Sequence, residues 1–286
     1  MKKSRNWRKT LGYIFVMIGI TFPLVAFLMM SYRQFSAEKS YKEFVENESN
    51  TTDSQRQITA TFIEEYEKNN ENASSAIVDP FDAGDYEGSY PDNIDMTKPF
   101  AYLRIPRLDM YKPIYLDATY YHMSVGVAQV AGTSLPVGGV GKRSVIAGHR
   151  DWWGDVMFLY IHTLEKGDSV YIEREGKSLR YEVDNFQIID PSEWEKLLPV
   201  KNEDMITLLT CEPFYPPRPY RLLVNCKRKE LPEKDTISSD VEIKEDNIHA
   251  NSTIRKVNTG IYLITIGLVV ALVFTIVKFI RYLLGK

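Results

Sequence analysis

The stretch MITLLTCEPFYPPRPYRLLVNC, residues 205–226, contains two apolar runs separated by a proline-rich loop. Apolar runs of this length, bounded by Pro and polar residues, are typical of β-strands. Outward from it, turn signals separate further candidate strands at residues 100–105, 114–116, 144–148, 169–174 and 179–189. Short strands at this density predict a mainly β fold, a closed barrel or a sandwich. Roughly 130 residues are enough to bury a real core.

Two side chains that could take part in catalysis follow apolar strands. Cys211 ends the run MITLLT, and His149 follows the run SVIAG. A thiol at a strand end beside a proline-rich loop is placed at a barrel mouth, although a buried structural cysteine is the common alternative. An imidazole changes charge near neutral pH and suits proton transfer, although a lone histidine is more often a hydrogen-bonded loop residue. The remaining histidines have less suggestive contexts: His122, His162 and His249.

Arg221 opens the second apolar run, and a buried arginine needs a partner or a purpose. Strand periodicity places Arg221 and Asn225 on one face and Cys226 on the other. If Arg221 faces Cys211, then Cys226 faces away, and no disulfide between the two cysteines is expected. No C-x-x-C or H-E-x-x-H pattern is present, which disfavours a zinc site. A thiolate, the imidazole of His149 and a guanidinium together are the groups that acyl transfer requires.

Two uncharged segments, residues 11–30 and 260–277, lie near the chain ends. Twenty helical residues span roughly 30 Å, about the thickness of the bilayer hydrocarbon. Both outer flanks are basic, and all 38 acidic residues lie between them. We therefore expect two membrane spans with both termini in the cytoplasm and the middle outside. The alternatives are a cleaved signal peptide for the first segment and a buried core helix for the second. An acidic middle disfavours nucleic-acid binding.

Helical spacing appears between the first segment and the barrel. Residues 35–47 and 53–70 each place apolar side chains on one stripe, and Asp53 or Ser54 is the predicted N-cap of the second helix. A short helix is also expected at residues 156–163. Residues 229–258 are polar and charged, as expected of a tether back to the second membrane segment.

The segments around these residues resemble the sortases, a family of membrane-anchored cysteine transpeptidases. TLLTC followed by RLLV carries the resemblance, as does SVIAGHR; YLRIPRLDMYKPIY (102–115), VAGTSLPVGG (130–139) and LEKGDSVYI (164–172) extend it. Together they cover roughly residues 75–228. The resemblance implies a closed eight-stranded β-barrel with Cys211, His149 and Arg221 as catalytic residues. It also implies that Thr210 and Leu209 contribute to a substrate-binding wall, and that no metal or organic cofactor is required.

Two features resemble the class C, pilin-polymerising sortases: the second membrane segment, and Asp79-Pro80-Phe81 ahead of the barrel. In that class an Asp-Pro-aromatic signature belongs to a lid. The resemblance implies that Asp79 pairs with Arg221 and that Phe81 covers Cys211. A simple turn is the alternative for the tripeptide. Glu-Pro-Phe follows Cys211 where the family pattern has Thr-Pro-Tyr, and Arg218 in the loop competes with Arg221 for the role of active-site arginine.

The implied reaction is cleavage of an LPxTG-like sorting signal between Thr and Gly through a Cys211 thioester. A lysine amine of the next pilin subunit then resolves the thioester. One alternative is a sortase that anchors surface proteins to an amine of the cell-wall peptide. Another is a membrane-tethered pilus assembly or binding protein without turnover. In each case the expected place is the cell membrane, with the barrel extracellular.

The expected organisation has eight parts: basic tail 1–10, transmembrane helix 11–30, helical juxtamembrane region 31–75, lid segment 76–95, catalytic barrel 96–228, tether 229–259, transmembrane helix 260–277 and basic tail 278–286.

Overall fold

The computed structural model describes residues 7–70, 77–81, 88–92, 94–229 and 250–284. The chain forms two compact units. The first consists of Ala37–Trp152 and Val156–Asn251 and contains the strands. The second consists of Met1–Ser36, Trp153–Asp155 and Ser252–Lys286 and is built from two long helical segments.

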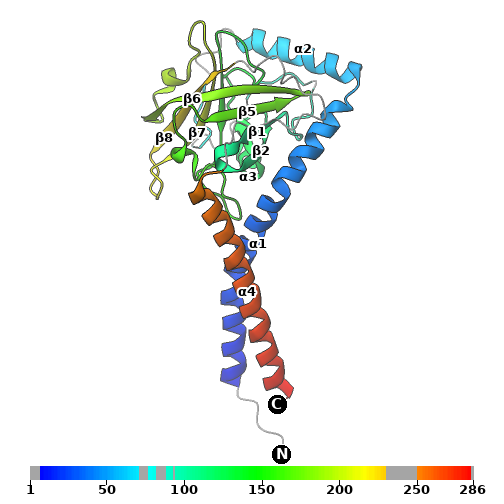
Figure 1. Cartoon of the computed structure of the whole chain (residues 1–286), viewed down its shortest axis with the longest axis vertical. Coiled ribbons are helices and arrows are strands. Elements are labelled where there is room, and N and C mark those ends of the chain that lie inside the picture. Colours follow the sequence, from blue (N-terminus) through cyan, green and yellow to red (C-terminus); the bar gives the residue numbers. More distant parts are fainter. Residues whose placement is uncertain (1–6, 71–76, 82–87, 93, 230–249, 285–286) are drawn as a thin grey trace, which may run out of the picture. The chain divides into compact units, whose positions relative to one another are not determined.

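Eight strands among the described residues close into a barrel in the order β1-β2-β3-β4-β7-β8-β6-β5 (Figure 1). The expectation of a mainly β, closed eight-stranded barrel is therefore confirmed. The strands are β1 Ala101–Ile105, β2 Met110–Tyr115, β3 Val127–Gln129, β4 Lys142–Ala147, β5 Ser169–Arg174, β6 Lys177–Ile189, β7 Asp204–Glu212 and β8 Tyr220–Arg228.

The apolar runs of β4, β7 and β8 have a physical reason. Almost every residue in the middle of these strands is buried, so the usual alternation of polar and apolar side chains is absent. Val145, Leu209 and Leu223 belong to one hydrophobic cluster inside the barrel. Fully burying one such aliphatic side chain stabilises a fold by roughly 1.5–3 kcal/mol. These three strands therefore form a rigid base for the residues at their ends.

The pairing of β4 with β7 is parallel, with Ala147 opposite Leu209. Parallel neighbours end at the same edge of a sheet, so the residues that follow both strands emerge together. The next strand, β8, runs antiparallel to β7 and places Arg221 opposite Cys211. One edge of the barrel thus receives His149, Cys211 and Arg221 from three adjacent strands.

Three local expectations differ from the structure: the strand β3, the helix at 156–163 and the helix N-cap at Asp53 or Ser54. The three-residue strand β3 was not predicted, because three residues are too few to show an alternating pattern; β3 pairs with both β2 and β4. Only Ile161–Thr163, within the helix expected at 156–163, is helical, and it forms the 3-10 helix η2. The other short helices in the described part are α3 Tyr120–Val125, η1 Pro106–Leu108 and η3 Trp194–Leu197.

Two longer helices precede the barrel: α1, Trp7–Ser49, and α2, Asp53–Asn70. The N-cap of α2 is Thr52, and neither Asp53 nor Ser54. The Thr52 hydroxyl accepts from the Gln55 amide N–H at 3.3 Å, and the Gln55 side chain accepts from the Thr52 N–H at 3.2 Å. This reciprocal arrangement is a capping box, in which Gln at the third helical position selects the residue three before it.

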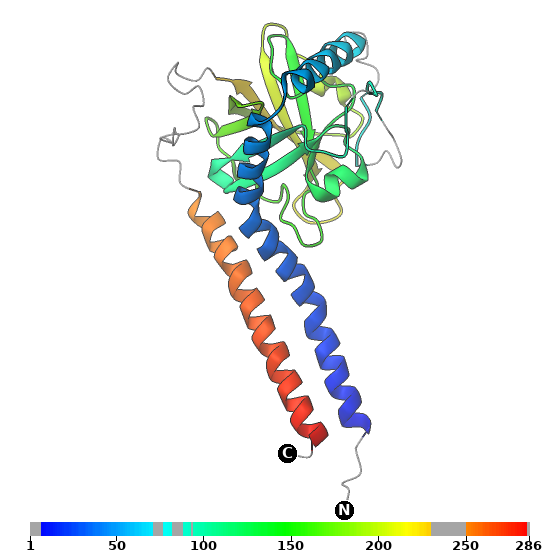
Figure 2. The same cartoon turned by 90° about the vertical axis from the view of Figure 1, so that its right-hand side faces the viewer.

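The second unit pairs the first part of α1 with α4, Ser252–Leu284, as Figure 2 shows. Both helices are long and apolar enough to cross a membrane. Ser31 and Thr265 share a hydrogen bond of 2.8 Å between the two helices, and the ring of Tyr13 lies 5.4 Å from that of Phe279. Polar bonds between apolar helices suit a bilayer, where such groups find no water.

Candidate active site

Backbone and side-chain bonds hold the ends of β4 and β7 together. The Gly148 N–H donates to the Leu209 carbonyl at 3.0 Å, and the Thr210 hydroxyl donates to the Gly148 carbonyl at 2.8 Å. These bonds lie immediately before His149 and Cys211. The positions of the imidazole and the thiol are therefore set by the strand pair and not by loop packing alone.

Three aromatic rings surround His149. Trp152 stacks on the imidazole with ring centroids 4.5 Å apart and planes 14° apart. Phe81 and Tyr120 each lie 5.9 Å from it at steeper angles. This burial lowers the pKa of His149 below its ordinary value of 6.5, and the nearby carboxylate of Asp151 opposes the shift. The neutral imidazole is thus the favoured form near neutral pH.

Arg221 is almost fully buried, at 2% exposed, and its guanidinium is bonded on several sides. Its Nε donates to both carboxylate oxygens of Asp79, at 3.2 and 3.0 Å, and its Nη2 also contacts that carboxylate. Its Nη1 donates to the carbonyls of Tyr220 and Arg218 at 3.0 and 3.3 Å. The expected pairing of Asp79 with Arg221 is present, and Arg218 does not occupy that place.

Asp79-Pro80-Phe81 lies against the barrel edge. The Phe81 N–H donates to Asp79 Oδ1 at 3.0 Å, which closes a tight turn. The Phe81 ring then lies 5.1 Å from the Arg221 guanidinium, beside His149. The tripeptide therefore spans two of the three candidate catalytic residues. Of the expected lid segment 76–95, residues 76, 82–87 and 93 lie outside the described residues.

Thr210 and Leu209 both pack in the protein interior. Both side chains are fully buried, Leu209 in the core cluster and Thr210 in its bond to Gly148. Their burial gives both residues a packing role, and their contribution to a substrate-binding wall stays a prediction. They fix the strand on which Cys211 stands.

The two cysteines have different surroundings. Cys211 is partly exposed at the end of β7, whereas Cys226 is fully buried in β8, opposite Ile206. Burial raises the pKa of the Cys226 thiol, which makes it inert as a nucleophile. Within the part of the chain that the structure describes, no group of three or more His, Cys, Asp and Glu side chains is arranged to hold a metal ion.

Sequence reasoning named Glu212 and Arg218 but missed the ion pairs that they form beside the candidate nucleophile and base. Arg150 pairs with Glu212 at 3.1 Å, and Arg218 donates to both oxygens of Asp151 at 2.7 and 2.9 Å. The sequence does show opposite charges directly after His149 and Cys211, at Arg150 and Glu212. Only the parallel register of β4 and β7 brings these two residues into contact.

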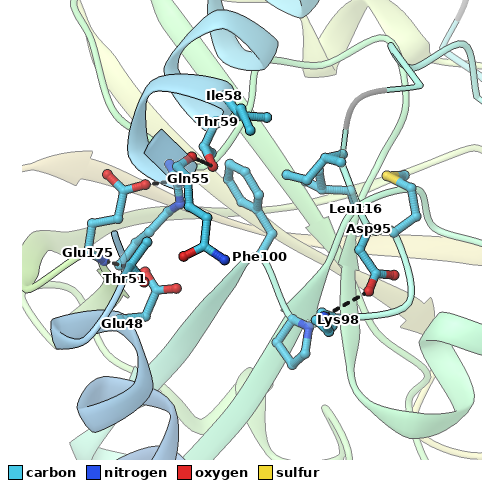
Figure 3. Close-up of a pocket in the computed structure, with 14 residues that line it drawn as sticks. Glu48, Thr51, Gln55, Ile58, Thr59, Asp95, Lys98, Phe100, Leu116 and Glu175 are labelled. Carbon is cyan, nitrogen blue, oxygen red and sulfur yellow. Dashed lines mark hydrogen bonds and ion pairs between the residues drawn. The ribbon is translucent and has the colours of Figure 1, made fainter. Parts of the chain in front are cut away.

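A separate cavity of about 360 Å³ lies between the α1–α2 junction and the barrel, as Figure 3 shows. Across it, the Glu175 N–H donates to the Glu48 carboxylate at 2.8 Å, and Lys98 pairs with Asp95 at 3.0 Å. Its lining contains no cysteine or histidine. The cavity is therefore distinct from the edge that carries Cys211.

The arrangement at the barrel edge contains the parts of a thiol acyl transferase: a partly exposed thiol, an imidazole held in its neutral form, and a guanidinium opposite the thiol. A sequence model described as the Sortase domain matches residues 103–229. Sortase A of Bacillus anthracis is 27% identical over 120 residues, which are 42% of this chain and 55% of that protein. The chain thus spans about half the length of this relative.

This chain covers a larger share of several solved structures. Sortase C-3 of Streptococcus pneumoniae is 40% identical, with 60% of this chain and 89% of that chain covered and a TM-score of 0.51. Sortase C-1 of Actinomyces oris is 33% identical, with 62% and 99% covered and a TM-score of 0.54.

Proposed function

The chain belongs to the sortase family, and we propose that it is a class C cysteine transpeptidase that polymerises pilin subunits. The observation that carries the proposal is the ion pair of Asp79 with Arg221, which holds Asp79-Pro80-Phe81 beside His149 at the barrel edge. The likeness to sortase C structures supports the same class. Pilins with an LPxTG-like sorting signal are the proposed substrates.

The proposed reaction begins when the lid leaves the site. Cys211 loses its proton to His149 and attacks the carbonyl carbon of the threonine in the Thr–Gly bond. Arg221, released from Asp79, stabilises the oxyanion. His149 passes its proton to the leaving glycine amine, and a thioester remains on Cys211.

An amine completes the transfer. The lysine side chain of another pilin attacks the thioester carbon, His149 accepts a proton from the attacking nitrogen, and the Cys211 thiolate departs. The product is an isopeptide bond between two subunits. The buried, neutral imidazole suits both steps, because it must accept and donate a proton near neutral pH.

Membrane placement follows from the two apolar helices at the chain ends. We propose that α1 and α4 anchor the protein in the cell membrane with both basic termini in the cytoplasm. The barrel is then extracellular, where sorting signals of exported pilins are accessible.

The test uses the full chain in detergent with a pilin subunit that carries an LPxTG-like signal. Wild type is expected to give SDS-resistant multimers and an enzyme–substrate thioester visible by mass spectrometry. Cys211→Ala should give neither. Cys226→Ala is the matched control, because that thiol is buried away from the site, and it should retain both products.

Other outcomes point to the alternatives. A thioester without multimers, resolved instead by a cell-wall peptide amine, would indicate a wall-anchoring sortase. Multimer formation by Cys211→Ala would contradict the proposed nucleophile. The absence of any product, together with assembly function that survives loss of Cys211, would favour the non-enzymatic alternative.

A further inference from the structure

An ion pair joins the residues that directly follow His149 and Cys211: Arg150, which is buried, and Glu212, which is partly exposed. Arg150 Nη2 lies 3.1 Å from Glu212 Oε2, and Arg150 is 2% exposed. The next residue along, Asp151, accepts two hydrogen bonds from Arg218. Two consecutive residues of the segment after β4 are thus tied to the end of β7 and to the loop between β7 and β8.

The loop between β7 and β8 is also attached through Phe214, whose ring lies 5.4 Å from that of His162 and 5.5 Å from the Arg150 guanidinium. Four of the loop's residues are proline and lack a backbone N–H: Pro213, Pro216, Pro217 and Pro219. Arg218 Nη2 donates to the Phe214 carbonyl at 2.8 Å, which closes the loop on itself, and the Arg218 carbonyl accepts from Arg221. Arg218 therefore links the loop, the segment after His149 and the arginine opposite Cys211.

The Arg150–Glu212 pair is a costly way to stabilise a fold. Burial lowers the pKa of Arg150, the carboxylate of Glu212 opposes the shift, and the Arg218 cation adds to it. Within the described residues, Arg150 Nε and Nη1 have no hydrogen-bond partner. A well-packed apolar pair of the same volume is often as stable as a buried ion pair. What an ion pair adds is a fixed geometry between the two segments that it joins.

We propose that Arg150–Glu212 and Asp151–Arg218 form a clasp that holds Cys211 and His149 at their working separation. The proposal rests on the proposed transpeptidase function and makes the four residues positioning residues for it. It gives a role to Glu212, which stands where the family pattern has threonine. It also gives a positioning role to Arg218, which does not take the place of Arg221 as the active-site arginine.

A double-mutant cycle on Asp151 and Arg218 tests the clasp, because this pair is partly exposed and its loss is expected to leave the fold intact. The variants are Asp151→Asn, Arg218→Gln and both together. If the clasp positions the thiol and imidazole, each single variant lowers kcat about tenfold with KM nearly unchanged, and the double variant is no worse. Simple electrostatics predicts something different, because removal of a negative and of a positive charge near Cys211 should change kcat in opposite directions. Opposite or additive effects would overturn the proposal.

The Arg150–Glu212 pair provides the second double-mutant cycle, with Glu212→Gln, Arg150→Met and the double variant. Loss of Glu212 alone leaves a buried cation, so the double variant is expected to be at least as active and as thermally stable as Glu212→Gln. Arg107→Gln is the matched control for the Asp151–Arg218 pair, because Arg107 forms a comparable partly exposed pair with Glu165 away from the site. It should retain wild-type kcat.

The alkylation rate of Cys211 by iodoacetamide gives a readout that needs no substrate. The clasp predicts that Asp151→Asn and Arg218→Gln change this rate in the same direction. If wild type joins no pilin and yet both variants shift alkylation together, the transpeptidase proposal fails and the clasp stands. If wild type joins pilins and the two variants shift alkylation in opposite directions, the clasp fails alone.

Discussion

At the residue scale, the state of His149 depends on the ring stacked against it. Trp152 covers one face of the imidazole, and burial lowers the pKa of His149. Trp152→Ala should admit water and raise this pKa toward 6.5, whereas Trp152→Phe keeps a stacked ring and should preserve the lowered value. NMR titration of the histidine rings, with His149→Gln to assign the signal, measures both. An unchanged pKa in Trp152→Ala would show that the ring does not control the imidazole.

The same substitution has a consequence for stability. A histidine whose pKa is lowered by folding binds protons less readily in the folded chain than in the unfolded chain. Its contribution is therefore fully present above about pH 6.5 and is lost as the pH falls through the folded-state pKa of His149. Trp152→Ala should weaken this pH dependence, as urea unfolding at pH 7.5 and pH 5 would reveal.

The candidate site residues differ in how far the sequence could predict them. Cys211, His149 and Arg221 each end or open an apolar run, so strand pattern and family resemblance were sufficient to select them. The Arg150–Glu212 contact was not predictable, because its partners are 62 positions apart and meet only through the parallel β4–β7 register. Sequence periodicity identifies strands but does not say which strands are neighbours.

At the element scale, the tripeptide Asp79-Pro80-Phe81 is held by the buried ion pair of Asp79 with Arg221 and by packing of the Phe81 ring against the core cluster and His149. Such a pair gives orientation with little net stabilisation, which suits an element that must leave. Combined Asp79→Ala and Phe81→Ala should release the lid and speed alkylation of Cys211 about tenfold, since opening is an equilibrium that each lost contact shifts. Asp92→Ala, an exposed carboxylate in the same segment, is the control and should leave the rate unchanged. Equal rates in all three proteins would mean that no closed lid protects the thiol.

Elements were predicted well where burial imposes a pattern. The long strands β6, β7 and β8 were recovered nearly to their ends: β7 and β8 from apolar runs that continue through the core, and β6 from the turn signals at its ends. β3 was missed, and a helix was wrongly expected over the segment before η2, because contacts with neighbouring segments determine these short conformations. Local propensity has little influence on elements this short.

At the scale of the whole molecule, charge is distributed unevenly along the chain. The basic ends flank the two apolar helices, and the acidic residues lie between them. Because transfer of Lys and Arg flanks across a bilayer is opposed during insertion, we expect both basic ends to remain in the cytoplasm. The two antiparallel helices, joined by the Ser31–Thr265 bond, place both ends on the same side, consistent with this orientation.

Cysteine labelling in intact cells tests this orientation. In a Cys211→Ala, Cys226→Ala background, single cysteines are introduced by Ser4→Cys in the basic tail and by Lys177→Cys on the exposed end of β6. A membrane-impermeant maleimide should label Lys177→Cys in intact cells and Ser4→Cys only after permeabilisation.

Labelling of Ser4→Cys in intact cells would place the basic tail outside. Loss of the Ser4→Cys position from the mature protein, measured by intact mass, would instead show that the first segment is a cleaved signal peptide. With Ser4→Cys protected and retained and Lys177→Cys labelled, α1 must cross the membrane, and the barrel must lie on its outer side.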